Sequence, residues 1–265
     1  MTEQGKIALA EGHNGAASAD APIRQMIGFE GLVNCRDVGG LPLEQGGVTR
    51  YGVLYRSETP QLMTPSDVRR ACEDLGIGRV IDLRGARFQD RDLGGSGPIG
   101  ADSRGVNIDF LELAGGIDAM DPSPDGFLPS LLDCGARPLT AFLASFAGTM
   151  TPVLVHCHTG KDRTGFIIAL TLALSGVRDR DIVADYVMSV PIFDRMMANL
   201  EAAGMPVPPQ APAYARDKPS ATGITAMLDR LRAEWSTPQA WARDHGIDDD
   251  LIAMARARLT GAPAL

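Results

Sequence analysis

The chain has 265 residues, of which 45% are hydrophobic and 22% charged, and this is the composition of an ordinary globular protein. Its net charge of −8 argues against nucleic acid and against an anionic membrane surface as bulk partners. No run approaches the roughly 18 apolar residues of a membrane span, so we expect no stable insertion into a membrane. By length, one large domain is favoured over two small ones.

The first 25 residues are rich in Ala, Gly and polar side chains. They lack the basic start and apolar core of a secretory signal. We therefore expect a disordered tail over residues 1–25 and one folded domain over residues 26–265. The expected location is cytoplasmic, with non-standard export as the alternative. The four cysteines show no framework spacing, which fits a reducing compartment.

The first two thirds of the folded region alternate between short apolar runs and helical patterns. This alternation predicts an α/β fold with a central, mostly parallel sheet flanked by helices. The expected strands cover residues 28–33, 52–55, 79–83, 105–110 and 152–156. The expected helices between and after them cover residues 65–75, 138–147 and 164–175.

From residue 179 onward the pattern is wholly helical, with expected helices over residues 181–189, 191–203, 224–235 and 249–259. A proline-rich stretch at 206–212 predicts a loop or hinge. One face of the second helix carries an apolar stripe, which fits either a core-facing side or the inner side of a movable lid. The stripe consists of Phe193, Met196, Met197 and Leu200.

The stretch from His156 to Gly165 reads H-C-H-T-G-K-D-R-T-G and joins an apolar strand to an apolar helix. A strand that ends at Cys157 presents the sulfur at the carboxyl edge of the sheet, where open α/β folds bind ligands. The following loop can direct its backbone N–H groups at one anion, and the helix adds its positive dipole end. Arg163 supplies a planar fork that matches two phosphoryl oxygens. These features predict a phosphate site with the Cys157 thiolate as nucleophile.

Two other kinds of site fit this stretch poorly. A nucleotide-binding P-loop requires Ser or Thr after the lysine, whereas Lys161 is followed by Asp162. A zinc site would need ligands that face one ion, which the consecutive residues His156, Cys157 and His158 cannot do. We therefore expect no metal and no other cofactor.

The stretch resembles the signature of the cysteine-dependent tyrosine and dual-specificity phosphatases. Its G-K-D-R-T-G form is similar to a narrower bacterial group, the atypical tyrosine and phosphoinositide phosphatases. Residues 34–40, 54–57, 80–84 and 241–247 are similar to further motifs of that group. The resemblance implies the cysteine-dependent phosphatase fold over residues 26–265, with a possible lid and hinge at 190–220.

The resemblance also implies the reaction and the site. Cys157 would attack phosphorus, a cysteinyl-phosphate would form, and water would release inorganic phosphate. The expected substrate is phosphotyrosine, with phosphoserine or phosphothreonine in addition. The alternatives are a phosphoinositide as main substrate, and a phosphate-binding module without turnover. Besides Cys157, the expected substrate-binding residues are His158, Thr159, Gly160, Lys161, Asp162, Arg163 and Thr164.

Phosphomonoester hydrolysis also needs an acid to protonate the leaving group. Asp162 is the first choice because it lies in the loop, as in the atypical group. The alternative is an acidic stretch with Asp118, Asp121 and Asp125, 32 to 39 residues before Cys157, which is similar in spacing to the mobile acid loop of ordinary tyrosine phosphatases. Asp82 and Asp109 are more remote candidates.

Four further interpretations concern neighbouring residues. His156 is expected to orient the end of the strand. Thr164 could donate its hydroxyl to the sulfur or cap the helix. Arg36 and Asp37 are expected to form a buried pair. The remaining cysteines are expected to be structural, with a resolving partner for Cys157 as the alternative; they are Cys35, Cys72 and Cys134.

Overall fold

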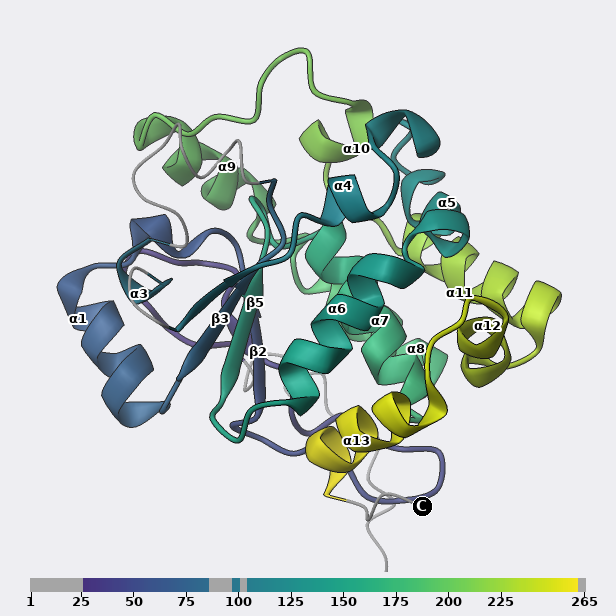
Figure 1. Ribbon diagram of the computed structural model, residues 1–265. Coiled ribbons are helices and arrows are strands. Elements are labelled where there is room, and N and C mark those ends of the chain that lie inside the picture. Colours follow the sequence, from purple (N-terminus) through teal and green to yellow (C-terminus); the bar gives the residue numbers. More distant parts are fainter. Residues whose placement is uncertain (1–25, 86–96, 101–103, 262–265) are drawn as a thin grey trace, which may run out of the picture.

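The computed structural model describes residues 26–85, 97–100 and 104–261. The tail expected at residues 1–25 lies outside this part. A five-stranded sheet runs through the centre in the order β1-β2-β5-β3-β4 (Figure 1). Only the edge strand β1 is antiparallel to its neighbour, and the other pairs are parallel. The strands are β1 (Arg36–Asp37), β2 (Leu54–Ser57), β3 (Arg79–Asp82), β4 (Gly105–Asn107) and β5 (Val153–His156).

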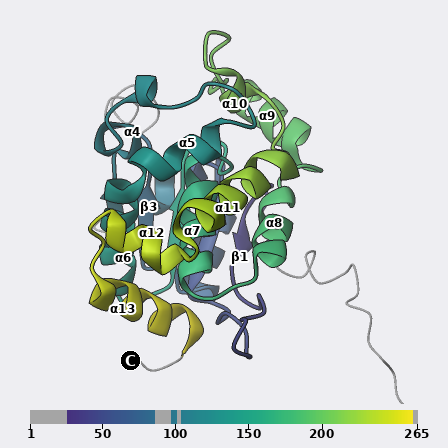
Figure 2. The ribbon, with the colours of Figure 1, turned by 90° about the vertical axis from the view of Figure 1, so that its right-hand side faces the viewer.

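Helices cover both faces of the sheet, as the sequence predicts (Figures 1 and 2). On one side lie α1 (Pro65–Arg69), which continues as a π-helical turn over Arg70–Asp74, and α3 (Gly97–Gly100). On the other side lie α5 (Phe127–Cys134), α6 (Ala136–Ala147), α7 (Arg163–Leu174), α11 (Ala221–Trp235), α12 (Pro238–Asp244) and α13 (Asp249–Thr260). α8 (Asp179–Val187) packs against α7 and α11.

The end of the sheet at which β5 finishes is covered by short helices and loops (Figure 1). α9 (Phe193–Ala202) and α10 (Ala213–Arg216) are joined by a loop that arches over this end. α4 (Phe110–Leu113) lies beneath α10, and the 3-10 turns Pro60–Leu62 and Ile117–Ala119 complete the set of elements. No helix among the described residues is both long enough and apolar enough to cross a bilayer.

The central position of β5 and α7 follows from their composition. All four residues of β5 are buried, which is typical of an interior parallel strand with helices on both faces. Every residue of α7 after Arg163 is buried as well, so the helix is apolar on all sides. The large core around α7 contains Phe142, Phe166 and Trp241. Trp241 also donates its indole N–H to the carbonyl of Leu132 at 3.0 Å, which ties α12 to α5.

The strand expected at residues 28–33 is wrong. No strand precedes β1 in the described part, and the isolated bridge between Met26 and Arg36 lies outside this range. The Asp67 carboxylate accepts from the amides of Glu30 and Gly31, at 2.8 Å each. Side-chain carboxylates therefore take the place of a neighbouring strand as hydrogen-bond partners.

The strand expected at residues 105–110 is correct only in its first half. β4 ends at Asn107, because Asp109 accepts from the amide of Glu112 and caps α4. α5 was not predicted from the sequence. The other expected strands and helices are confirmed, with boundaries that differ by at most three residues.

Candidate active site

The register of the sheet brings three strand ends to one edge. Ser57 of β2 and Asp82 of β3 both stand beside His156, the last residue of β5. Cys157 follows immediately and is buried, with only 1% of its surface exposed. The loop then runs over Gly160 to the start of α7 at Arg163. The predicted position of the cysteine, between a central strand and a central helix, is therefore confirmed.

Gly160 is required by the path of this loop. Its φ of +70° lies in the left-handed region, which favours glycine. A Cβ at this position would also clash with the carbonyl of Ser57. Any other residue would push the loop away from β2, so the glycine allows the loop to rest on the neighbouring strand.

Four consecutive carbonyl groups of the loop, from Cys157 to Gly160, accept hydrogen bonds from groups outside it. In a planar trans peptide the carbonyl and the following N–H point in opposite directions, so the N–H groups of residues 158–161 are directed into the loop. This is the arrangement that binds an anion. The donors, in order, are His156 Nδ1 at 2.9 Å, Thr59 N at 2.9 Å, Asn34 Nδ2 at 3.0 Å and Arg56 Nη2 at 2.8 Å.

A cavity of about 440 Å³ lies above the loop. His158, Thr159, Asp162 and Arg163 line it from the loop side. The opposite wall is largely apolar and comes from residues far along the chain, namely Leu111, Ile117, Met205, Pro206, Val207, Pro208, Pro212 and Tyr214. Arg84 and Gln61 contribute polar groups at the side. The cavity therefore combines a polar floor with an apolar wall.

Arg163 occupies the first position of α7 and lines this cavity. Its guanidinium donates to the carbonyl of Leu83 at 3.3 Å, which fixes it relative to the end of β3. Arg84 next to Leu83 forms a multiple hydrogen bond with Asp82, the shortest contact being 2.8 Å. The two guanidinium groups give this side of the cavity a positive character.

Asp162 is buried at the N-terminus of α7 and lines the cavity. Burial raises the pKa of Asp162, although the positive charge of Lys161 acts in the opposite direction. A carboxyl group with a raised pKa that faces a cavity has the properties of a general acid.

Lys161 is not free to contact a substrate in this structure. Its side chain is 99% buried and does not line the cavity. The ammonium donates to both carboxylate oxygens of Asp162, at 2.7 and 2.9 Å, and to the carbonyl of Tyr214 in α10. It also lies 6.0 Å from the ring centre of Phe193 in α9. Lys161 thus connects the loop to the segment above it.

The alternative acids lie elsewhere. Asp118, Asp121 and Asp125 are exposed, and none of them lines the cavity. Asp121 accepts from the amide of Ser123, which lowers its pKa. Asp125 accepts from the hydroxyl of Ser220 at 3.0 Å. Of the more remote candidates, Asp109 caps α4 and Asp82 binds Arg84.

His156 and Asp82 form a buried layer beneath the loop. Burial lowers the pKa of His156, so the ring is neutral near pH 7. For Asp82, burial opposes ionisation, but His156 and Arg84 outweigh it and lower the pKa. His156 therefore supports Cys157 through its hydrogen bond to the Cys157 carbonyl, which agrees with the orienting role expected for it.

His158 and Thr164 differ in what they contact. His158 lines the cavity, and its Nε2 lies 3.1 Å from the carbonyl of Met205. Thr164 does not cap α7, because the N-cap residue is Asp162. The Thr164 hydroxyl is buried and has no hydrogen-bond partner among the described residues.

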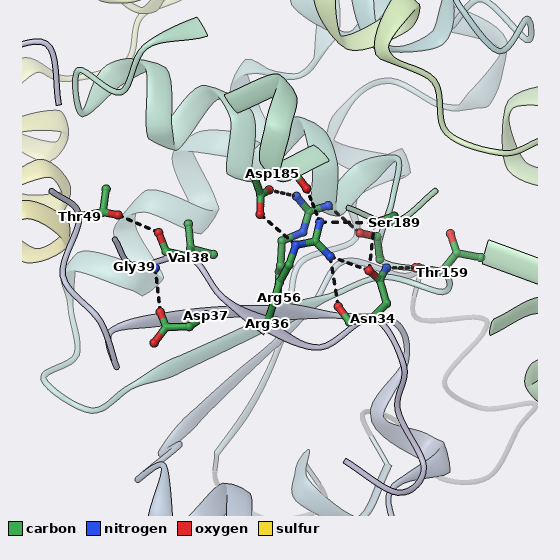
Figure 3. Close-up of polar contacts among 11 residues, drawn as sticks. Asn34, Arg36, Asp37, Val38, Gly39, Thr49, Arg56, Thr159, Asp185 and Ser189 are labelled. Carbon is green, nitrogen blue, oxygen red and sulfur yellow. Dashed lines mark hydrogen bonds and ion pairs between the residues drawn. The ribbon is translucent and has the colours of Figure 1, made fainter. Parts of the chain in front are cut away.

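The pair expected between Arg36 and Asp37 is wrong. Both side chains are buried, but on adjacent residues of a strand they point to opposite faces (Figure 3). Asp37 accepts from the amides of Gly39 and Gly52, at 2.8 and 2.7 Å. Arg36 instead pairs with Asp185 of α8 at 2.9 Å.

All four cysteines have free thiols. Burial is the main reason that the pKa of Cys35 lies well above its ordinary value and that the pKa of Cys134 is raised. Cys72 accepts from the Arg104 guanidinium at 3.4 Å. A raised thiol pKa makes a poor attacking group, so a structural role suits Cys35 and Cys134 better than a resolving role.

Several residues around the loop and the cavity were not predicted from the sequence. Asn34 and Arg56 hold two of the loop carbonyls, and both lie in motifs that the resemblance had highlighted without a role. Tyr214 carried no signal in the sequence, because it reaches Lys161 of the loop only through the packing of α10. Asp185 of α8 likewise acts at a distance in the sequence, because it binds Arg56, which contacts the loop.

Comparison with known proteins agrees with this geometry. The sequence profile of the tyrosine phosphatase family matches residues 27–261. A protein of Cupriavidus necator named as a tyrosine-protein phosphatase is 32% identical over an alignment of 185 positions that covers 65% of this chain and 66% of the relative. The triple specificity protein phosphatase PtpB of Mycobacterium tuberculosis is 34% identical over an alignment of 206 positions that covers 64% of this chain and 71% of PtpB.

A tyrosine-protein phosphatase of Nostoc commune is 30% identical over a shorter stretch, 40% of this chain and 38% of the relative. The family profile covers most of the chain and includes both the loop and the motifs before it. The resemblance inferred from the loop is therefore confirmed, and the chain belongs to the tyrosine phosphatase family.

Proposed function

We propose that this protein hydrolyses phosphomonoesters through a cysteinyl-phosphate intermediate, with phosphotyrosine as the main substrate. The observation that carries the proposal is the loop itself, in which four carbonyls are held outward so that the following N–H groups face inward beside Cys157. Such preorganised donors stabilise the charge that develops on the equatorial oxygens of a transferring phosphoryl group.

In the first step the Cys157 thiolate attacks phosphorus in line, so that a P–S bond forms as the P–O bond to the alcohol breaks. Asp162 donates its proton to the departing oxygen. In the second step Asp162 accepts a proton from water, water attacks phosphorus, and the P–S bond breaks to release inorganic phosphate. Arg163 binds two phosphoryl oxygens in both steps. The unpartnered Thr164 hydroxyl is suited to stabilise the sulfur as it leaves.

The cavity favours an aromatic phosphoester over a multiply phosphorylated head group. Its distal wall is apolar, and a phenyl ring can pack there against Tyr214 and the prolines. Lys161 would be a natural partner for a second phosphate, but its ammonium is engaged by Asp162 and Tyr214. The name of the triple specificity relative indicates that PtpB acts on more than one kind of substrate. Activities on phosphoserine, phosphothreonine or phosphoinositides are therefore the alternatives for this chain.

A reducing environment is needed because Cys157 must remain a thiol, and three further free cysteines suit the same environment. We therefore propose a cytoplasmic location. We also propose that no metal takes part. No group of three or more His, Cys, Asp or Glu side chains within the described part of the chain is placed to hold one ion.

The mechanism is tested with Cys157→Ser. A serine hydroxyl is far less ionised than a thiol, so turnover of aryl phosphates should be lost while binding of a phosphate analogue such as tungstate is retained. Residual activity within tenfold of the wild type would contradict the mechanism. Loss of both turnover and tungstate binding in a folded variant would also contradict it.

Two further measurements address the metal and the substrate. The wild type should keep its full activity in excess chelator and lose it with a thiol alkylator; chelator-sensitive, alkylator-resistant turnover would contradict the proposal. A paired assay on a phosphotyrosine peptide and a phosphoinositide should give the higher kcat/KM on the peptide. The reverse order would make the phosphoinositide the main substrate.

A further inference from the structure

Behind the phosphate loop lies a buried polar cluster formed by Asn34, Arg36, Arg56, Asp185 and Ser189 (Figure 3). Its members come from the segment before β1, from β1 and β2, from α8 and from the turn that follows α8. All five side chains are buried, and none of them lines the cavity. The hydrogen bonds of these side chains instead join the sheet to α8 and to the loop.

Two members of the cluster reach the loop directly. Asn34 Nδ2 donates to the carbonyl of Thr159 at 3.0 Å, and Arg56 Nη2 donates to the carbonyl of Gly160 at 2.8 Å. These contacts determine the orientation of the peptides that follow each carbonyl. The amides of Gly160 and Lys161 point into the loop because the two carbonyls are held on its outer side.

The remaining members fix Asn34 and Arg56 in place. The Asp185 carboxylate accepts from Arg56 at 2.6 Å and from Arg36 at 2.9 Å. The amide oxygen of Asn34 accepts from Arg36 at 2.5 Å and from the hydroxyl of Ser189 at 2.9 Å. Both acceptor contacts fix which way the Asn34 amide faces, so that its NH₂ group is left to face the loop.

The cluster also carries an excess of positive charge. Two guanidinium groups share one carboxylate, which gives two positive charges and one negative charge, all of them buried. Removal of Arg56 would leave a balanced pair of Arg36 and Asp185, whereas removal of Asp185 would leave two unpaired cations. A buried cation without a partner is strongly destabilising, so variants of Asn34 and Arg56 are better probes than variants of Asp185.

We propose that Asn34 and Arg56 are positioning residues of the phosphate loop, which hold the Thr159 and Gly160 carbonyls outward so that the loop amides bind the phosphoryl oxygens. This inference rests on the proposed function for its consequence in catalysis, but its effect on anion binding is independent of turnover.

The sharpest probe is Asn34→Asp. The new side chain is nearly isosteric, keeps the oxygen that Arg36 and Ser189 bind, and brings a negative charge to a cluster with a positive excess, so the fold should be retained. It replaces the NH₂ donor by an oxygen that repels the Thr159 carbonyl. We expect tungstate affinity and kcat/KM to fall by about 10- to 100-fold, because small misplacements at a catalytic site have effects of this size.

Arg56→Met is a second probe, because it removes the donor to Gly160 and keeps the pair of Arg36 and Asp185. A matched control is Thr49→Val. Thr49 is equally buried, and its hydroxyl donates to the backbone carbonyl of Val38 at 2.8 Å, but it contacts no residue of the loop (Figure 3). The control should lower the melting temperature and leave tungstate affinity unchanged.

Tungstate dissociation constants of the folded variants, well below their melting temperatures, provide the decisive measurement. Amide NMR shifts of residues 158–161 on tungstate addition should be smaller in Asn34→Asp than in the wild type. A folded Asn34→Asp protein with wild-type affinity within twofold, or an equal loss in Thr49→Val, would overturn the proposal. A wild type that binds tungstate without turnover would instead contradict the proposed function alone.

Discussion

At the scale of single residues, the proposed general acid, Asp162, is the group for which the structure adds most to the sequence. The loop position of Asp162 is visible in the sequence, but its burial is not. Burial favours the neutral carboxyl, the form that can donate a proton, and it raises the pKa in spite of the adjacent lysine. The exposed residues Asp118, Asp121 and Asp125 lack this environment.

We predict that Asp162→Asn slows turnover according to the leaving group. Alkyl and tyrosyl phosphates release a basic oxygen and should lose about 10²- to 10⁴-fold, the usual contribution of a general acid. An aryl phosphate with an acidic phenol needs little protonation and should lose far less. Rates across a series of substituted phenyl phosphates measure this. If Asp162→Asn loses the same factor in rate on every substrate, Asp162 has a structural role. If Asp125→Asn instead shows a loss that grows with the basicity of the leaving group, the general acid is Asp125 of the exposed stretch.

At the scale of elements, α9, α10 and the loop between them form the wall opposite the phosphate loop. The expected apolar stripe of α9 does face inward, because Phe193, Met196 and Leu200 are buried together with Met205. The stripe packs against Val33 and Leu62. The same segment supplies the cavity wall from Gly204 to Ala215. Its place fits the lid expected at residues 190–220, and its movement stays a prediction.

Lys161 couples this segment to the acid, and Lys161→Met tests the coupling. The ammonium stabilises the Asp162 carboxylate, so its removal should raise the pKa of Asp162 further. Activity requires the protonated acid, is present below its pKa and is lost as pH rises through it. The alkaline limb of the profile of kcat/KM against pH should therefore move to higher pH in the variant.

The matched control for this experiment is Lys218→Met. Lys218 also binds the segment, through Asp194 of α9 at 2.6 Å, but its side chain is 53% exposed and does not line the cavity. Its profile should coincide with that of the wild type. An alkaline limb that stays in place, or moves to lower pH, in Lys161→Met would show that the pair does not control the acid.

At the scale of the whole molecule, Glu58 links stability to pH. It is buried at the end of β2 and accepts from the amides of Val33 and Asn34, at 2.6 to 3.1 Å. Burial raises its pKa from 4.5 to about 7. The folded state thus binds a proton more tightly than the unfolded state, and stability falls as pH rises from about 4.5 to about 7. Above that range, the free energy of unfolding is lower by on the order of 3 kcal/mol because of this one group.

We predict that Glu58→Gln, which cannot ionise, gains stability relative to the wild type as pH rises from 5 to 8. Urea unfolding at both pH values measures the change. Asp67→Asn serves as control, because Asp67 also binds backbone amides, and these hydrogen bonds outweigh its burial and lower its pKa. The lowered pKa of Asp67 lies below this range, so Asp67→Asn should lower the free energy of unfolding by the same amount at both pH values. If the difference in free energy of unfolding between Glu58→Gln and the wild type is the same at pH 5 and pH 8, the titration of Glu58 does not control stability.

Much of this protein follows from the sequence by itself. The apolar runs of β5 and α7 are long enough and uniform enough to predict a buried strand and helix, with Cys157 between them as the predicted nucleophile. Arg163, at a fixed spacing, is the predicted oxyanion partner. The placement of both residues is confirmed, because it depends on local chain geometry, in which a strand end, a short loop and a helix start have few ways to be arranged.

The tertiary structure decided the features that depend on distant partners. Residues 28–33 have the composition of a strand, yet the carboxylates of Asp67 and Glu58 bind their backbone instead. Arg36 has its negative partner next to it in the sequence and takes Asp185 of α8, because neighbouring side chains on a strand point to opposite faces. Lys161 has the charge to bind a substrate, but its ammonium donates to the carbonyl of Tyr214 in α10 instead. In each case the competing partner is more than 20 residues away, so only the packing of the folded chain could bring it into contact.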